Sequence, residues 1–290
     1  MKGIILAGGT GSRLYPLTAA TNKQLISVYD KPLIYYPLST MMLAGIREVL
    51  IITRPEDSEI FAKVIGDGSR LGMSIQYATQ ANPTGIPEAF LIGRDFIAGR
   101  SCALVLGDNV FFGHGLRSIL REAAGHDSGA TIFGYWVNDP QRFGVVTFDK
   151  AFRAIDLEEK PANPRSNYAV TGLYFYDGRV ADLAASLKPS VRGETEITDL
   201  NRLYLEMGEL RVRRLERGFA WLDTGTPDSL LDAANYIATI ERRQGLKIAC
   251  IEEIAWRQNW IDDAQLQRIT ASLKDCAYGQ YLKATLERGQ

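Results

Sequence analysis

The sequence contains few of the residues that usually bind transition metals. Of 290 residues only two are histidine, His114 and His126, so a histidine-rich metal site is excluded. The three cysteines, Cys102, Cys250 and Cys276, are far apart, odd in number and not arranged in metal-type pairs. This spacing favours reduced structural thiols in a cytoplasmic protein over a disulfide framework.

The chain also lacks a long apolar segment and an excess of either charge. After Gly3 the apolar run is only Ile4 to Ala7, too short for the hydrophobic region of a signal peptide. Elsewhere nothing approaches the ~20 apolar residues that span a bilayer. The formal net charge of -1 argues against nucleic acid or an anionic membrane as a partner, although it leaves room for a local basic pocket.

Short β-rich runs alternate with helical patterns in the first half of the chain. Pro32 fits the first position of the first predicted helix. Alternating strands and helices imply right-handed crossovers and a mostly parallel sheet. The predicted strands are 3–7, 48–53, 73–79 and 102–106, and the predicted helices are 33–44, 56–65 and 87–97.

The pattern changes after residue 129 to strands without clear helices between them. Such a run predicts strands added to the sheet, some of them antiparallel. We predict strands at 130–137, 144–148, 151–158 and 168–176, helices at 196–207 and 227–244, and only short helices after Gly245. The predicted fold is α/β, with a Rossmann-like mixed, mostly parallel sheet flanked by helices and a small C-terminal helical appendage.

A glycine-rich loop follows the first predicted strand, with Arg13 at its end. Its glycines are Gly8, Gly9 and Gly11. Missing Cβ atoms let backbone N–H groups approach a polyphosphate, Arg13 adds a fork of donors, and Lys23 can add a second cation. The loop is not a P-loop, and Leu14 stands where a dinucleotide-binding fingerprint needs glycine. By itself the loop therefore leaves phosphate binding and a plain structural turn both open.

Several dispersed blocks, in a fixed order, resemble those of the sugar nucleotidylyltransferases. The blocks are 8–18 with 23–25, 29–37, 107–109, 158–161, 167–172, 221–226 and 278–282. They span nearly the whole chain and are most similar to the branch of the family that makes dTDP-glucose. The resemblance implies transfer of dTMP from dTTP to α-D-glucose 1-phosphate, with release of pyrophosphate, as the first step of dTDP-L-rhamnose synthesis.

Nucleotidyl transfer joins two anions, so catalysis depends chiefly on charge neutralisation and positioning. Asp108, directly after the predicted strand 102–106, and Asp223, after a short strand, are the candidate Mg²⁺ ligands. The carboxyl ends of strands in open α/β sheets face the ligand crevice. Either aspartate taken singly could instead be a turn or helix-cap residue.

The resemblance also implies the remaining roles. Arg13 would bind the leaving pyrophosphate, and Lys23 the triphosphate near the reacting centre. The catalytic set is then Arg13, Lys23, Asp108, Lys160 and Asp223. The nucleotide-binding set is Gly8, Gly9, Gly11, Arg13, Gln24, Gln80, Gly85 and Asp108. The sugar-phosphate-binding set is Asn109, Gly144, Glu159, Lys160 and Val170.

Side-chain chemistry is compatible with these assignments. Lys160 can bring a compact positive charge to an anionic acceptor, and Glu159 can accept hydrogen bonds from sugar hydroxyls. An exposed charged pair at the end of a strand would have the same sequence, so that alternative stays open. The amides of Gln24 and Gln80 can pair with a thymine or uracil edge, and a free backbone at Gly85 could complete that reading.

The sequence departs from the family pattern at three places. Ile26 and Ser27 follow Lys-Gln-Leu where the family has Leu-Pro, and Phe143 replaces a customary tyrosine. Residues 84–88 replace the usual Asp-Gly-Leu-Ala-Gln, which puts the negative charge of Glu88 where an amide is usual. The choice between dTTP and UTP therefore stays open, because a thymine methyl is recognised by apolar fit worth only ~1–3 kcal/mol.

The resemblance divides the chain into a catalytic unit of 1–226 and a C-terminal helical region of 227–290. The catalytic unit would consist of a nucleotide-binding part of about 1–110 and a sugar-phosphate part of about 111–226. The C-terminal region would serve packing, assembly into a homotetramer and feedback inhibition by a dTDP-sugar end product, although simple helix packing is an alternative. The implied regulatory residues are Leu43, Gly113, Glu253 and Arg257.

Two other functions compete with this interpretation. A catalytically silent nucleotide-sugar sensor on the same fold is disfavoured because all five residues of the catalytic set are intact. A Rossmann dehydrogenase is disfavoured by Leu14 and by the lack of a hydride-transfer constellation.

Overall fold

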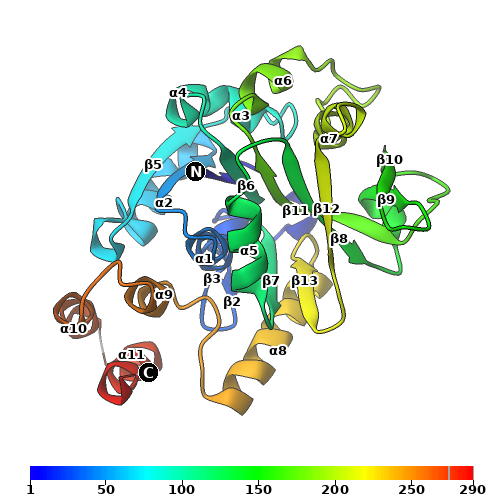
Figure 1. Cartoon of the computed structure of the whole chain (residues 1–290). Helices are drawn as coiled ribbons and strands as arrows, with labels where there is room; N and C mark the ends of the chain where they lie inside the picture. The colour runs from blue at the N-terminus through cyan, green and yellow to red at the C-terminus, as the bar shows by residue number, and fades with distance from the viewer. Residues whose placement is uncertain (274, 290) are drawn as a thin grey trace.

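The computed structural model describes residues 1–273 and 275–289. It consists of a mixed sheet flanked by helices (Figure 1). The strands of the large sheet are β1 (Lys2–Ala7), β4 (Glu48–Thr53), β5 (Ser74–Thr79), β6 (Cys102–Leu106), β8 (Ala130–Trp136), β9 (Gly144–Phe148), β10 (Ala154–Glu159), β11 (Tyr168–Tyr176) and β12 (Leu210–Leu215). They lie in the order β10-β9-β11-β6-β1-β4-β5, with β8 joining β11 to β12.

Strands β6, β1, β4 and β5 pair in parallel, and so do β8 and β12 at another edge of this sheet. Strand β11 then pairs antiparallel with β6 and β8, so the predicted mixed sheet with antiparallel members is confirmed. Successive side chains of β1 point to opposite faces, as a strand requires. Ile4 packs in the hydrophobic cluster on one face and Ile5 in the cluster on the other, and both are fully buried.

Helices cover both faces of the sheet. The α-helices of the described residues are α1 (Tyr35–Leu43), α2 (Ser58–Ile65), α3 (Glu88–Ile92), α4 (Arg94–Ile97), α5 (Leu116–Ala124), α6 (Val180–Ser186), α7 (Ile197–Glu206), α8 (Pro227–Gln244), α9 (Ile251–Arg257), α10 (Asp263–Ser272) and α11 (Ala277–Arg288). One face is packed by α1, α2, α5 and α9 to α11, the other by α3, α4, α6 and α7. In residues 1–273 and 275–289 every helix is too short or too polar to cross a membrane.

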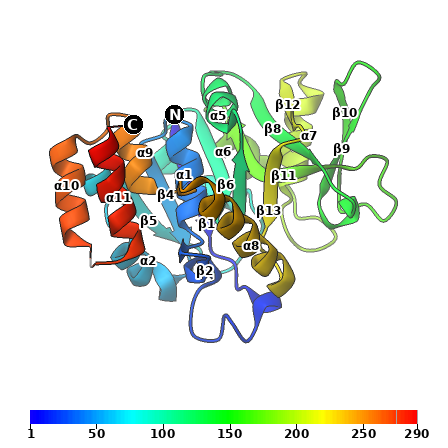
Figure 2. The ribbon, with the colours of Figure 1, turned by 90° about the horizontal axis from the view of Figure 1, so that it is seen from below.

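The C-terminal helices lie beside α1 and share its hydrophobic cluster (Figure 2). Ile251 of α9, Leu266 of α10 and Leu282 of α11 are buried there with Met41 of α1. The Gln258 amide also donates a hydrogen bond to the Met42 carbonyl at 2.6 Å. Within the described part of the chain no strand follows Gly245, as predicted.

Helix α8 packs against the segment that follows the glycine loop. The Thr226 side chain and Ser229 form a reciprocal capping box, Pro227 occupies the first turn, and Gly245 ends the helix in a left-handed conformation. Leu230, Ala233 and Ile237 of this helix pack in a third cluster whose other members are Leu14, Val28, Leu33, Tyr36, Val110, Ile248 and Ala249. The predicted span 227–244 is confirmed.

The prediction that Pro32 begins the first helix is wrong. Pro32 lies in β3 (Lys31–Pro32), which pairs with β2 (Ser27–Val28) in a short hairpin, and α1 begins only at Tyr35. The Tyr36 hydroxyl donates to the Val28 carbonyl at 2.8 Å and ties the helix to the hairpin. Pro37 is the proline in the first turn of α1, where its missing N–H costs nothing.

Other differences from the predicted elements are local. Gly93 divides the predicted helix 87–97 into α3 and α4. The predicted strand 151–158 begins later, at Ala154, because Asp149 accepts backbone hydrogen bonds from Ala151 and Arg153 in a tight turn. Besides the hairpin of β2 and β3, the sequence analysis did not predict α5, α6, β12 and β7 (Asn109–Gly113). Strand β7 pairs with β13 (Phe219–Asp223) in a separate two-stranded sheet.

Candidate active site

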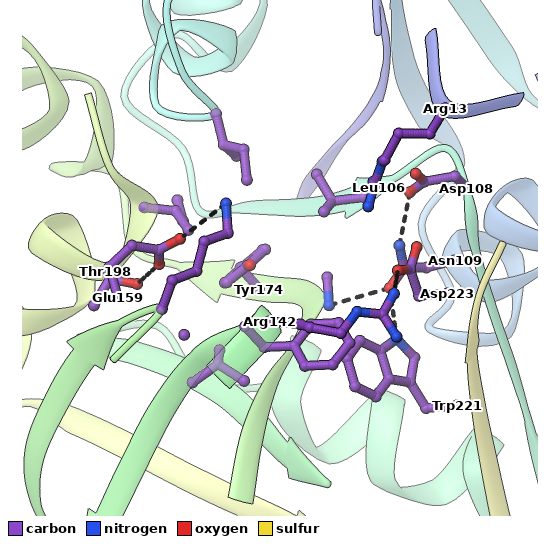
Figure 3. A pocket seen from close by; sticks show the side chains of 17 residues that line it. Arg13, Leu106, Asp108, Asn109, Arg142, Glu159, Tyr174, Thr198, Trp221 and Asp223 are labelled. Carbon is purple, nitrogen blue, oxygen red and sulfur yellow. Dashed lines mark hydrogen bonds and ion pairs between the residues drawn. The ribbon is translucent and has the colours of Figure 1, made fainter. Parts of the chain in front are cut away.

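A cavity of about 360 Å³ lies between the glycine loop and the antiparallel half of the sheet (Figure 3). Polar side chains approach it from two sides. Glu159 and Thr198 lie on one side, and Arg13, Asp108, Asn109 and Asp223 on the other. The cavity is lined by Arg13, Ile86, Leu106, Asp108, Asn109, Arg142, Phe143, Gly144, Glu159, Lys160, Val170, Gly172, Tyr174, Ile197, Thr198, Trp221 and Asp223.

The three glycines of the loop have different local environments. Gly11 has φ of 61°, and a Cβ on it would lie 2.8 Å from Cγ2 of Thr18. A Cβ on Gly8 would lie 2.9 Å from Oε1 of Gln80. A Cβ on Gly9 would meet no atom of the described residues within 4 Å. Gly11 therefore shapes the turn, whereas Gly9 borders open space that a ligand can occupy.

The loop returns to the sheet through a short 3-10 turn at Lys23–Leu25. The Asn22 side chain accepts from the backbone N–H of Gln24 at 2.9 Å and donates to Asp57 at 2.6 Å, which anchors this turn. Lys23 is thereby held with its ammonium group 2.6 Å from Oδ2 of Asp108. The sequence prediction that these two residues belong to one site agrees with this contact.

Asp108 is held in place by Asn109. The Asn109 amide donates to Oδ1 of Asp108 at 2.8 Å, and its own Oδ1 accepts from the Trp221 indole at 2.5 Å and from the backbone N–H of Gly172 at 3.3 Å. A side chain at position 172 would strike this amide, since a Cβ there would lie 2.7 Å from Oδ1. Asn109 thus positions the aspartate, besides lining the cavity.

Pairing of β7 with β13 brings Asp223 to the same place. Asp223 lies opposite Asn109 in the register, and Thr224 donates to the Asp108 carbonyl through both its backbone N–H, at 3.2 Å, and its hydroxyl, at 2.8 Å. Two aspartates separated by 115 positions in the sequence, from residue 108 to residue 223, therefore face one cavity.

Burial raises the pKa of Asp223 above its ordinary value, and the charge of Asp108 raises it further. The cations Lys23, Arg13 and Arg142 lower the pKa of Asp223 in part. A like-charged carboxylate pair of this kind is suited to a divalent cation, which would stabilise both ionised groups. Mg²⁺ commonly takes one or two carboxylates and completes its shell with phosphate oxygens and water. The donor set therefore fits Mg²⁺.

The described residues contain no group of three or more histidine, cysteine or acidic side chains that could hold a metal by themselves. Asp108 and Asp223 would thus need further oxygen ligands, from a substrate phosphate or from water, to complete the shell of the ion.

The opposite side of the cavity is built around Glu159. One of its oxygens accepts from the Thr198 hydroxyl at 2.5 Å, and the other lies 3.5 Å from the Lys160 ammonium group. Gly144 leaves room for this arrangement, because a Cβ there would lie 2.8 Å from the Thr198 hydroxyl. Lys160 adopts a left-handed backbone conformation with φ of 42°, and its N–H donates to the Phe143 carbonyl at 3.0 Å.

Gln24, Gln80 and Gly85 do not line this cavity. Gln24 and Gln80 are buried, and the Gln24 amide oxygen has no hydrogen-bond partner in the part of the chain that the structure describes. Gly85 forms an isolated parallel bridge with Thr195, and its contact with the base stays a prediction. The nucleotide-binding set therefore divides between Arg13 and Asp108 in the cavity and residues around the ends of β1 and β5.

The sequence analysis missed several polar residues of the cavity, among them Arg142 and Thr198. Arg142 lies 3.6 Å from Oδ2 of Asp223, and Thr198 holds Glu159. Neither belongs to a block that resembles the family, and a single arginine or threonine in a loop or helix carries no pattern. Only the fold brings them to the site.

A second cavity, of about 410 Å³, contains the four residues predicted to form a regulatory site. Leu43, Gly113, Glu253 and Arg257 all line it. Arg257 donates to one oxygen of Glu253 at 2.7 Å, and the Tyr281 hydroxyl donates to the other at 2.6 Å. The structure thus brings these residues together, and their regulatory role stays a prediction.

A family match establishes the class of protein that this fold and site define, and a solved structure shows the same fold. The family described as "Nucleotidyl transferase" matches residues 2–240. A solved UDP-glucose pyrophosphorylase in complex with UDP-glucose has the same fold, with a TM-score of 0.72 over 82% of this chain and 98% of that one at 22% identity. The chain belongs to the nucleotidyl transferase family.

Relatives within the family are glucose-1-phosphate thymidylyltransferases. The enzyme of that name from Xanthomonas campestris pv. campestris is 60% identical over 288 residues, which cover 99% of this chain and 98% of the relative. A solved Bacillus anthracis protein assigned to the same enzyme, in complex with sucrose, is 40% identical with a TM-score of 0.75, over 81% of this chain and 94% of that one. The family, the enzyme class and the fold expected from the sequence are confirmed.

Proposed function

We propose that the chain transfers the dTMP group of dTTP to α-D-glucose 1-phosphate and releases pyrophosphate. The observation that carries the proposal is one cavity that Arg13 and the Asp108–Asp223 pair line on one side and Glu159 and Lys160 line on the other. The names of the relatives support the same reaction.

Each side of the cavity suits one substrate. Gly9 and Arg13 would bind the triphosphate of the nucleotide. Lys160 would bind the phosphate of glucose 1-phosphate, whose sugar hydroxyls can donate to Glu159. A phosphate oxygen of glucose 1-phosphate forms a bond to the α-phosphorus while the bond from that phosphorus to the pyrophosphate oxygen breaks. Both substrates enter as anions and both products leave as anions, so the protein need not transfer a proton.

We infer that Asp108 and Asp223 would hold Mg²⁺ together with triphosphate oxygens. The ion would supply neutralisation of the phosphate charges. Lys23 orients one carboxylate oxygen of Asp108, and Asn109 fixes the other. Arg142 and Arg13 lie near Asp223 and can bind the charge that develops on the leaving pyrophosphate.

We further propose that the second cavity binds a dTDP-sugar end product as a feedback inhibitor. Arg257, Arg117 and Lys247 line it and can bind a diphosphate, while Leu43 provides an apolar wall. Assembly into a homotetramer, a cytoplasmic location and a place in dTDP-L-rhamnose synthesis stay predictions. The division into 1–226 and 227–290 stays a prediction too, since the family match extends to residue 240.

Pyrophosphate release tests the reaction directly. The purified chain is assayed with glucose 1-phosphate, Mg²⁺ and each nucleoside triphosphate in turn, with and without EDTA. We expect release with dTTP that requires the metal. A clear preference for UTP would change the nucleotide but not the class, and no release with any nucleotide would favour the nucleotide-sugar sensor.

A further inference from the structure

Glu88, the first residue of α3, holds the side chain of Gln80 in a fixed orientation. One oxygen of Glu88, Oε2, accepts a hydrogen bond from Nε2 of Gln80 at 2.5 Å. The same oxygen accepts from the backbone N–H and the hydroxyl of Thr84. Gln80 is only 4% exposed, so water cannot readily replace this contact. An ionised carboxylate only accepts, and it therefore dictates which end of the Gln80 amide points toward it.

The other end of that amide faces the glycine loop. Oε1 of Gln80 lies so close to Gly8 that a Cβ there would be 2.9 Å from it. Gly8 follows β1, and Gln80 follows β5 of the same parallel sheet. The carboxyl ends of parallel strands form the ligand crevice in folds of this kind. Gln80 thus offers an acceptor, and not a donor, to whatever lies over the start of the loop.

We propose that Glu88 sets the pyrimidine specificity of this enzyme by locking Gln80 with its amide oxygen toward the base. This inference rests on the proposed function, because it requires a pyrimidine nucleotide bound at the glycine loop. Thymine and uracil carry an N3–H donor, which an amide oxygen accepts. Cytosine carries an unprotonated N3 acceptor, which an amide oxygen repels.

Cytosine could pair with Gln80 only if the amide turned over. That rotation would place Oε1 of Gln80 against Oε2 of Glu88, leaving two acceptors in contact with no proton between them. A glutamine at position 88 would permit the rotation, because its own amide could turn and donate. The carboxylate of Glu88 therefore excludes an alternative that an amide would allow.

Glu88 also contributes to a tether between the two halves of the site, which the experiment must separate from specificity. The Thr84 carbonyl accepts from the Thr195 N–H at 2.8 Å and from its hydroxyl at 3.2 Å. Thr195 shortly precedes α7, which carries Thr198, the partner of Glu159. Loss of this tether alone would affect every nucleotide equally, whereas loss of the amide lock would change the choice between them.

The test is Glu88→Gln, assayed by pyrophosphate release with glucose 1-phosphate and dTTP, UTP or dCTP. We expect kcat/KM to fall about threefold with dTTP and UTP and to rise about tenfold with dCTP, because the Gln80 amide becomes free to turn. The ratio of dTTP to dCTP would then fall about thirtyfold. An equal fall with all three nucleotides would overturn the proposal and leave a structural role.

Two matched controls accompany this variant. Thr84→Val removes one donor to Glu88 and leaves its contact with Gln80, so the ratio of dTTP to dCTP should stay unchanged. Glu59→Gln removes an exposed carboxylate on α2 and should change neither rate nor ratio. A change in the ratio with either control would contradict the assignment to Glu88.

A swapped pair provides an independent measurement. Gln80→Glu alone would bring two carboxylates together and should lower kcat/KM with dTTP at least about tenfold. Adding Glu88→Gln restores a donor opposite an acceptor and should recover most of that loss. A double variant as poor as the single one would overturn the lock. Wild-type protein that releases no pyrophosphate with any nucleotide would instead contradict the proposed function.

Discussion

Lys23 and Asp108 form an ion pair of 2.6 Å across 85 positions of sequence, and both side chains are largely withdrawn from solvent. The pair joins the return of the glycine loop to the carboxyl end of β6. It places a positive charge beside one of the two proposed metal ligands. The ion pair therefore connects the glycine loop directly to the proposed metal site.

Removing one partner of this pair should cost more than removing both. Lys23→Met leaves the Asp108 carboxylate without its cation and should lower the free energy of unfolding by about 2 kcal/mol. Adding Asp108→Asn should recover part of that loss, because no unpaired charge remains. Urea unfolding of both single variants and the double variant measures this coupling, and simple additivity would show that the two residues act independently.

Asp223→Asn should reduce kcat severely and make the fold more stable at neutral pH. The raised pKa of Asp223 means that the folded state favours the protonated carboxyl, so ionisation costs stability once the pH rises through the folded-state pKa. An amide avoids that cost. The stability gain should vanish below pH ~3.9, the ordinary value of an aspartate, where the carboxyl is protonated in both states.

Thermal unfolding of wild type and Asp223→Asn between pH 3 and pH 8 tests the sign of this effect. A variant less stable than wild type at pH 7 would contradict it. Normal turnover of the variant would remove Asp223 from the metal site.

Gly9 and Gly11 should respond differently to the same substitution. Gly11→Ala forces a Cβ into a left-handed position 2.8 Å from Thr18 and should lower stability by about 1–2 kcal/mol. Gly9→Ala meets only open space among the described residues and should leave stability intact. If triphosphate occupies that space, Gly9→Ala should raise the KM for dTTP about tenfold or more. An unchanged KM would place the triphosphate elsewhere.

Lys160→Met should weaken the binding of glucose 1-phosphate and leave the binding of the nucleotide unchanged. Its side chain is 45% exposed and lies 3.5 Å from Glu159, so stability should change little. The KM for glucose 1-phosphate should rise about tenfold or more, since a charge-assisted contact to phosphate is lost. Lys150→Met, an exposed lysine in the turn after β9, is the control. An equal rise in the KM for dTTP would contradict the division of the cavity.

Most of the strands and helices could be predicted from local pattern, because their side chains alternate or repeat with the element they form. Strands 48–53, 102–106, 144–148 and 168–176 and the helix 227–244 have their predicted bounds. The hairpin at Ser27–Pro32 was missed because its strands are two residues long and too short to show a period. Pro32 fits either a helix start or a hairpin, and only the pairing with Ser27 decides between them.

The candidate site was predictable only where a residue type and a family block coincide, as at Arg13, Asp108 and Lys160. Arg142 and Thr198 reach the cavity through contacts that no spacing in the chain encodes. The charge of Glu88 was visible in the sequence as a departure from the family. Its contact with Gln80 was not visible there, and the role that we propose for the charge depends on that contact.

The sequence by itself determined the class of fold, the enzyme family and most of the chemistry-bearing residues, because these follow from residue type, period and block order. Tertiary structure decided which of them meet. The pairing of β7 with β13 brings Asp223 close to Asp108. The hydrogen bonds of the Asn22 side chain hold Lys23 beside the Asp108 carboxylate, and burial raises the pKa of Asp223. Such effects depend on distance and desolvation across the folded chain, which no local pattern records.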